Sequence, residues 1–130
     1  MAFSTAATAY ASAAHDHLPQ ERYPAAALAG VLTYIGQARR AIAAGDVPQA
    51  HGALIAAQQV VALLRGSLQP GAFPELAQRL DALYGFMLEQ LRAANVTKSP
   101  QPLDQITPVV LSLREAWERA ADLVLGGGAR

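Results

Sequence analysis

The sequence predicts an all-α protein, an antiparallel up-and-down four-helix bundle preceded by a flexible or short-helical N-terminal arm. Alanine and leucine are abundant and β-branched residues are few, which favours helix because alanine has the highest helix propensity and leucine loses little rotamer freedom. Apolar side chains recur at helical spacing in four segments that are separated by glycine, proline and polar residues. The chain of 130 residues is the size of one domain, and short connections make consecutive helices antiparallel.

The first two helices are expected at 24–44 and from about residue 47 to the break at 69–71. Pro24 suits a first helical turn, where its missing N–H would be unpaired anyway, and Gly45 suits the left-handed residue that ends a helix. Asp46 is placed to accept free N–H groups of the second helix. The expected stripe of the first helix is Leu28, Val31, Leu32, Ile35, Ala38 and Ile42, and that of the second is Ala50, Leu54, Ala57, Val61, Leu64 and Leu68.

The third helix is expected from about Pro74 to Asn95, and the fourth ends at the glycines 126–128. Pro108 leaves two alternatives open, because a proline inside a helix removes a backbone hydrogen bond. Either Thr107 caps a helix that begins at Pro108, or a longer helix continues through it with a kink. The expected stripe of the third helix is Leu76, Leu80, Leu83, Met87, Leu91 and Ala94, and that of the fourth is Ile106, Val110, Leu113, Trp117, Ala120 and Val124.

The sequence divides into three parts. Residues 1–22 form an arm with no sustained helical stripe and room for a short helix around 5–14. Residues 23–125 form the four-helix bundle, and residues 126–130 form a flexible tail. Four apolar stripes suffice to fold the bundle without a cofactor.

Composition excludes several classes of function. Ten basic and ten acidic residues balance to zero, and the basic residues are scattered, whereas nucleic-acid binding needs clustered positive charge. The chain has no cysteine, which excludes a disulfide framework and a thiolate metal site. The N-terminus lacks the pattern of a signal peptide, and no apolar run is long enough to span a membrane. We therefore expect a cytoplasmic protein with no membrane insertion.

The sequence patterns that could indicate catalytic or metal-binding residues are weak. His51 lies at the start of the second helix but lacks the lysine and glycine that follow the histidine of helical phosphotransfer domains. His15-Asp16-His17 has no further ligands at metal-site spacing. Acidic residues alternate with arginines on polar faces, as in Glu115 and Arg119, and predict solvated ion pairs. We expect no enzyme and no metal site.

Surplus apolar residues on two helices predict a docking surface. Ile55 and Leu63 fall outside the core stripe of the second helix, and Val60 widens its apolar arc. Leu111 points away from the stripe of the fourth helix. Several such residues on neighbouring helices suggest a groove for another apolar segment. The alternative is that Phe3, Tyr10 or Leu18 of the arm covers them.

Motifs between residues 45 and 120 resemble one protein family. They are Gly45-Asp46-Val47, Glu75-Leu76-Ala77, Leu83-Tyr84-Gly85-Phe86-Met87, Leu91-Arg92-Ala93-Ala94-Asn95 and Leu113-Arg114-Glu115-Ala116-Trp117. This series is similar to FliS, the flagellin export chaperone family. Three features depart from the family pattern. Ala27-Leu28-Ala29-Gly30-Val31 replaces Leu-Tyr-Asp-Gly-Ala and retains only the glycine, Gly85 replaces the usual aspartate, and residues 18–24 replace the usual Ser-Pro start of the first helix.

The resemblance implies a four-helix bundle around which the disordered C-terminal segment of flagellin wraps and folds into helices. That mode would place Ile55, Val60, Leu63 and Leu111 against the client, and would make Tyr10 the self-cap that the client displaces. It leaves open whether the protein contacts the flagellar export gate once flagellin is loaded. It also leaves open whether the protein is a monomer or a weak homodimer. The alternative function is a helical adaptor or chaperone for another secreted client.

We expect that deletion of residues 1–22 leaves helical content and cooperative melting largely intact, because no helical stripe occurs before Pro24. Circular dichroism of the truncated protein checks this. An unfolded truncated protein would show that the arm belongs to the core.

Overall fold

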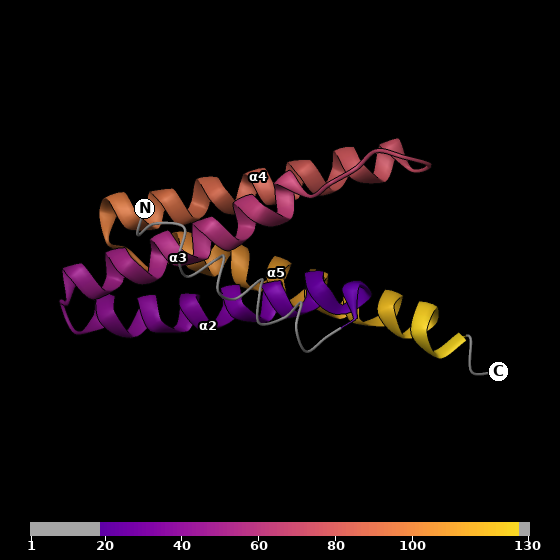
Figure 1. The fold of residues 1–130 in the computed structure, drawn as a ribbon. Coiled ribbons are helices and arrows are strands. Elements are labelled where there is room, and N and C mark those ends of the chain that lie inside the picture. The colour runs from indigo at the N-terminus through magenta and orange to yellow at the C-terminus, as the bar shows by residue number, and fades with distance from the viewer. Residues whose placement is uncertain (1–18, 128–130) are drawn as a thin grey trace.

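A computed structural model describes residues 19–127, and this part of the chain is helical from end to end apart from short connections (Figure 1). A 3-10 turn, η2 (Gln20–Arg22), leads directly into the first long helix. The four long helices are α2 (Tyr23–Ala43), α3 (Val47–Gly66), α4 (Pro74–Thr97) and α5 (Gln101–Gly127). Each runs antiparallel to the one before it, which confirms the predicted up-and-down bundle.

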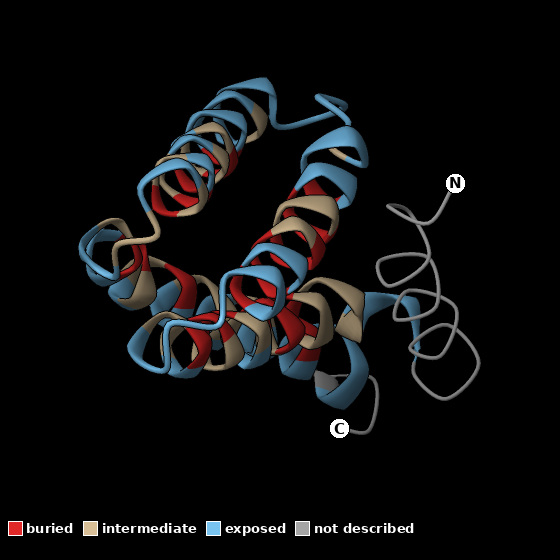
Figure 2. Ribbon diagram, turned by 90° about the vertical axis from the view of Figure 1, so that its left-hand side faces the viewer, coloured by how far each residue is buried: buried red, intermediate tan, exposed pale blue. Residues whose placement is uncertain are grey.

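The four helices enclose one apolar core. α2 packs against α3 and α5, and α4 packs against the same two helices, so α2 lies diagonally opposite α4 and α3 opposite α5. Buried residues face inward on all four helices (Figure 2). The largest fully buried side chains are Leu28, Val31, Leu54, Val61, Tyr84, Met87, Leu91, Leu103, Ile106 and Val110.

The turn between α2 and α3 forms as predicted. Gly45 has a left-handed backbone, with φ of +71°, and its N–H donates to the carbonyl of Ile42 at 3.1 Å. The N–H of Asp46 donates to the carbonyl of Ala41 at 2.8 Å, which completes the paired hydrogen bonds of a Schellman motif. The Asp46 carboxylate then accepts the N–H of Gln49 at 3.2 Å and caps α3.

The helix α3 is long and apolar enough to cross a membrane, with a mean hydropathy of 1.2 over its most apolar window. However, 44% of that window is buried within the bundle, and α3 packs against both α2 and α4. A core helix of a globular bundle has the same composition, and this explains the hydropathy.

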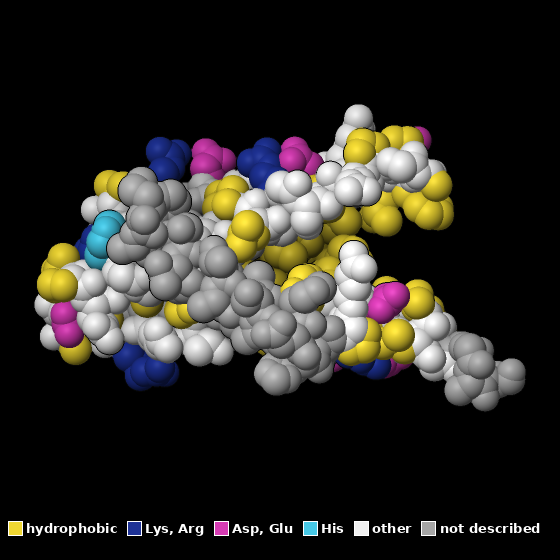
Figure 3. Space-filling view, in the orientation of Figure 1, with side chains coloured by type: hydrophobic (Ala, Val, Ile, Leu, Met, Phe, Trp, Pro, Cys, Tyr) yellow, Lys and Arg dark blue, Asp and Glu magenta, His cyan; other side chains and the backbone are white. Residues whose placement is uncertain are grey.

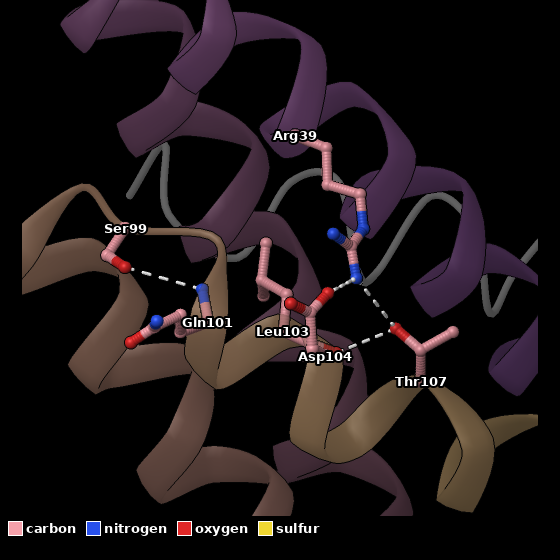
Figure 4. Close-up of polar contacts among 6 residues, drawn as sticks. All are labelled: Arg39, Ser99, Gln101, Leu103, Asp104 and Thr107. Carbon is pink, nitrogen blue, oxygen red and sulfur yellow. Dashed lines mark hydrogen bonds and ion pairs between the residues drawn. The ribbon is translucent and has the colours of Figure 1, made fainter.

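The helix α5 continues through Pro108, so the alternative of a helix that begins at Pro108 is wrong. Thr107 is not an N-cap, because its hydroxyl donates back to the carbonyl of Leu103 at 2.7 Å. Arg39 of α2 reaches across to α5, where Nη2 lies 2.6 Å from Oδ1 of Asp104 and 3.5 Å from Oγ1 of Thr107 (Figure 4). These contacts join the first turns of α5 to α2.

Two predicted stripes extend further than the core does. Leu76 near the start of α4 and Val124 near the end of α5 were expected to be buried, but both are exposed. Ala120 is also exposed, and Ala121 is buried instead. The predicted stripe of the third helix included Leu83, but Leu83 is half-buried. Its neighbour Tyr84 is the residue that is buried in the core.

The predicted arm and tail lie largely outside the described residues, and Tyr10 and His15-Asp16-His17 are among the residues not described. At the end of the arm, η2 packs on α5, and Nη2 of Arg22 lies 2.8 Å from Oδ1 of Asp122. The division at residues 22 and 125 stays a prediction.

We expect Leu91→Ala to lower the free energy of unfolding by about 2–5 kcal/mol, because Leu91 is fully buried and its removal leaves a cavity. The matched control is Leu123→Ala on an exposed leucine of α5, which should change stability by less than about 0.5 kcal/mol. Urea denaturation of both variants measures the difference. Equal losses would show that the core is not where the structure places it.

Candidate functional site

The bundle is open at one end, where an apolar groove of about 370 Å³ lies between the helices. We call it the end groove. Figure 3 shows hydrophobic side chains gathered in a hollow between the overhanging ends of the helices. Its apolar lining comes from the start of α2, the end of α3, the first half of α4 and the second half of α5, with Pro24, Leu64, Leu68, Phe73, Leu76, Leu80, Tyr84 and Trp117 as its larger members.

The end groove exists because the helices differ in length. α2 and α3 have 21 and 20 residues, whereas α4 and α5 have 24 and 27. At about 1.5 Å per residue, the surplus amounts to one or two helical turns. The first turns of α4 extend beyond the end of α3, and the last turns of α5 extend beyond the start of α2 (Figure 1). The core-facing stripes of these overhanging turns have no helix to cover them.

The connection between α3 and α4 forms one rim of the end groove. Gly71 has a positive φ of 44°, which favours glycine, and the N–H of Phe73 donates to the carbonyl of Pro70 at 2.9 Å. This turn leads into α4 at Pro74 and leaves the Phe73 side chain 71% exposed. One turn later Leu76 is 53% exposed. The two side chains present a large apolar surface to solvent.

The inner end of the groove is formed by Tyr84 and Trp117. Trp117 Nε1 donates to the Tyr84 hydroxyl oxygen at 3.3 Å, and this contact joins α4 to α5. Tyr84 is buried and Trp117 is half-buried. Burial raises the pKa of the Tyr84 hydroxyl above its ordinary value of 10.0, although the hydrogen bond from Trp117 acts in the opposite direction.

A bidentate ion pair fastens α3 to α4 beside the groove. Nε and Nη2 of Arg65 donate to the two carboxylate oxygens of Asp81, at 2.7 and 3.2 Å, and the hydrogen bonds lower the pKa of Asp81. The guanidinium lies over Gly85, where an added Cβ would approach it to 3.3 Å. A larger residue at position 85 would crowd this pair.

The chemistry of the end groove favours binding over catalysis. Among the described residues that line it, none carries a charge, and its polar groups are those of Ser67, Gln69, Tyr84, Trp117 and the backbone. Within residues 19–127, no three acidic or histidine side chains come together as a metal site. His51 faces the side chain of Asn95, with Nδ1 3.0 Å from the amide nitrogen. An uncharged apolar groove suits the apolar face of another chain.

The structure separates the residues that the sequence proposed as contacts. Leu63 is 49% exposed and Ile55 is half-buried, both on α3, whereas Leu111 is 39% exposed on α5. α3 and α5 are diagonal helices, with α2 and α4 between them, so these residues stand on helices that are not packed side by side. Val60 is 2% exposed and belongs to the core cluster, so the expectation that it widens an exposed apolar arc is wrong. The buried stripe of α3 is therefore broader than four-residue spacing suggests.

Sequence reasoning missed the end groove because it assigned Leu76 and Trp117 to the core. Both residues do lie on core-facing stripes, but periodicity does not show whether a neighbouring helix is long enough to cover them. The lengths of the predicted stripes carried no such signal, because the second, third and fourth cover the same number of residues. The available signal was Phe73, an aromatic residue directly before Pro74.

A helical bundle that exposes an uncharged apolar groove is typical of proteins that bind an amphipathic segment. Residues 3–124 match the flagellar protein FliS family, and the chain belongs to that family. It is 32% identical over 90 residues to the flagellar secretion chaperone FliSB of Pseudomonas aeruginosa, over 68% of this chain and 71% of the relative.

Two further relatives bear the name flagellar secretion chaperone FliS. The protein of Vibrio cholerae is 29% identical over 92 residues, which cover 71% of this chain and 68% of the relative. The protein of Bacillus subtilis is 30% identical over 91 residues, which cover 70% of this chain and 67% of the relative.

Tyr84→Phe should reduce the loss of stability at alkaline pH. The unfolded chain ionises Tyr84 near pH 10.0, while the folded protein keeps it neutral to higher pH. The stabilisation is therefore complete below that pH and is lost as pH rises through the folded pKa. Urea denaturation between about pH 9 and pH 11 should show a larger decline for the wild type than for the variant. Equal declines would contradict a buried, neutral Tyr84.

Proposed function

We propose that this FliS-family protein is a cytoplasmic export chaperone that holds the C-terminal segment of flagellin unpolymerised before flagellar type III export. The observation that carries the proposal is the uncharged end groove on a bundle of this family. The groove is the continuation of the core, so an apolar helix face that enters it meets the same kind of surface that α2 and α3 meet elsewhere.

Burial of the exposed rim would supply the binding energy. Phe73 and Leu76 are largely exposed, and each large apolar side chain removed from water contributes roughly 1.5–3 kcal/mol. A client segment that is disordered alone must first be ordered, which lowers the net affinity. While it is bound, its apolar face is covered and is not available for polymerisation.

The exposed leucines outside the groove favour a client that wraps around the bundle. Leu63 on α3 and Leu111 on α5 stand on diagonal helices, so a single helix in the end groove does not reach both. We propose Ile55, Leu63 and Leu111 as secondary contacts for further client turns. We also keep Tyr10 as the proposed self-cap, which the client would displace.

Leu76→Glu should weaken binding of a synthetic peptide of the flagellin C-terminal segment by at least about tenfold, because a carboxylate in an apolar interface loses its water without a counter-charge. Leu63→Glu should also weaken binding of the peptide if α3 contacts the client. Titration calorimetry measures both affinities, and wild-type binding should show a negative heat-capacity change from apolar burial. Trp117 is the single tryptophan of the chain, so its fluorescence reports directly on the groove.

The matched control is Val96→Glu, which places the same carboxylate on an exposed valine at the other end of α4. It should bind the peptide like the wild type, and all three variants should melt like the wild type. If Leu76→Glu folds and binds normally, the end groove is not the client site. If the wild type does not bind the peptide at all, the client is another secreted protein.

A further inference from the structure

The helix α5 is packed very differently on the two sides of Pro108. Before the proline, Leu103 and Ile106 are completely buried, and Val110 just beyond it is buried as well. After Val110, Leu113 and Trp117 are half-buried and Leu123 and Val124 are exposed, whereas Ala121 is buried. The first part of α5 therefore belongs to the core, while the second part is less buried and places Trp117 in the lining of the end groove.

The first part of α5 is also held by polar contacts. The Ser99 hydroxyl accepts the N–H of Gln101 at 3.3 Å at the start of the helix. Arg39 binds Asp104 and Thr107 from α2, at 2.6 and 3.5 Å (Figure 4). Complete burial of Leu103 and Ile106 is the main restraint on this part of α5. Arg39 adds a partly exposed link from α2 to two successive turns of α5.

Pro108 stands at the boundary between the two parts. It has no N–H to donate to the carbonyl oxygen of Asp104, so one bond of the helix is missing there. The neighbouring Thr107 hydroxyl bonds back to the carbonyl of Leu103, a contact that also bends helices. Pro108 is exposed, whereas Ile106 and Val110 point into the core, so the missing bond lies on the outer face. Bending at that point moves the second part of α5 toward or away from the core.

The packing of η2 on α5 and the burial of Ala121 oppose such bending, together with polar contacts. The polar contacts that tie residues 109–127 to the rest of the described chain include the hydrogen bond from Trp117 to Tyr84 at 3.3 Å and the ion pair of Asp122 with Arg22 at 2.8 Å. The ion pair is solvent-exposed on both sides, and such pairs are weak.

We infer that α5 is a two-part helix, in which residues 109–127 pivot at Pro108 against a first part fixed to α2, and that this pivot sets the width of the end groove. The hydrogen bond between Trp117 and Tyr84 holds the groove at its narrower width, since it joins α4 and α5 across the inner end of the groove. The pivot requires no client. Only the effect of the pivot on client binding rests on the proposed function.

Hydrogen–deuterium exchange of the full chain without client tests the pivot. Pro108→Ala restores the N–H and should slow amide exchange in residues 109–117 by at least about tenfold, because opening at the pivot becomes rarer. Exchange in the core of α2 should change much less. Trp117 fluorescence should show weaker quenching by acrylamide in the variant, since the indole is then less often exposed.

The matched control is Pro102→Ala in the first turn of the same helix, where the missing N–H breaks no helical bond. It should leave exchange in residues 109–117 unchanged. If Pro108→Ala slows exchange equally in α2, α4 and α5, the proline affects global stability and there is no pivot. Unchanged exchange in residues 109–117 would also overturn the inference. Both results are independent of flagellin binding, so failure of the pivot is distinct from failure of the proposed function.

Discussion

The structure depends on the mutual burial of four apolar stripes whose lengths do not match. Where all four helices overlap, each stripe is covered by two neighbours, and Leu28, Leu54, Met87 and Ile106 are excluded from water. α2 and α3 are shorter than α4 and α5, so this coverage ends before the longer stripes do. The same residue pattern thus produces a closed core at one end and an exposed apolar groove at the other. No separate structural element is needed to make the groove.

The two ends of the bundle also differ in how firmly they are joined. At the closed end, the Schellman motif at Gly45 and the Asp46 cap fix the α2–α3 turn, and Arg39 joins α2 to the first turns of α5. At the open end, the contacts include the bidentate ion pair between Arg65 and Asp81, an exposed ion pair between Arg22 and Asp122, and a hydrogen bond at the inner end of the groove. Local opening costs least where few apolar contacts and exposed polar links hold the chain together. The open end is therefore the part of the bundle where we expect local opening to cost least.

Much of the fold could be predicted from the sequence, because it rests on local signals. The spacing of apolar residues located the helices, and Gly45 and Asp46 marked a boundary that requires their particular backbone and side-chain chemistry. The course of α5 through Pro108 could not be predicted, because tertiary contacts such as those of Arg39 decide whether a helix tolerates a proline.

The candidate site was less predictable than the fold. Leu76 and Val124 look like core residues in sequence, and only the relative lengths of the packed helices leave them uncovered. Val60 lies outside the four-residue spacing of its stripe but is buried, because the core covers a broader face of α3 than that spacing indicates. The exposure of Leu63 and Leu111 followed from their position outside the stripes, whereas their placement on diagonal helices depends on the order of packing.

The absence of charge among the described lining residues has a consequence for turnover. Under the proposed function, a client helix in the groove meets a lining without charge, so salt has no ion pair with that lining to screen. Tyr84 of the lining stays neutral at physiological pH, because burial raises its pKa. We therefore expect release of the client to depend on a competitor, a second apolar surface that binds the helix or the groove. In such a system the direction of transfer is set by the relative affinities of successive acceptors.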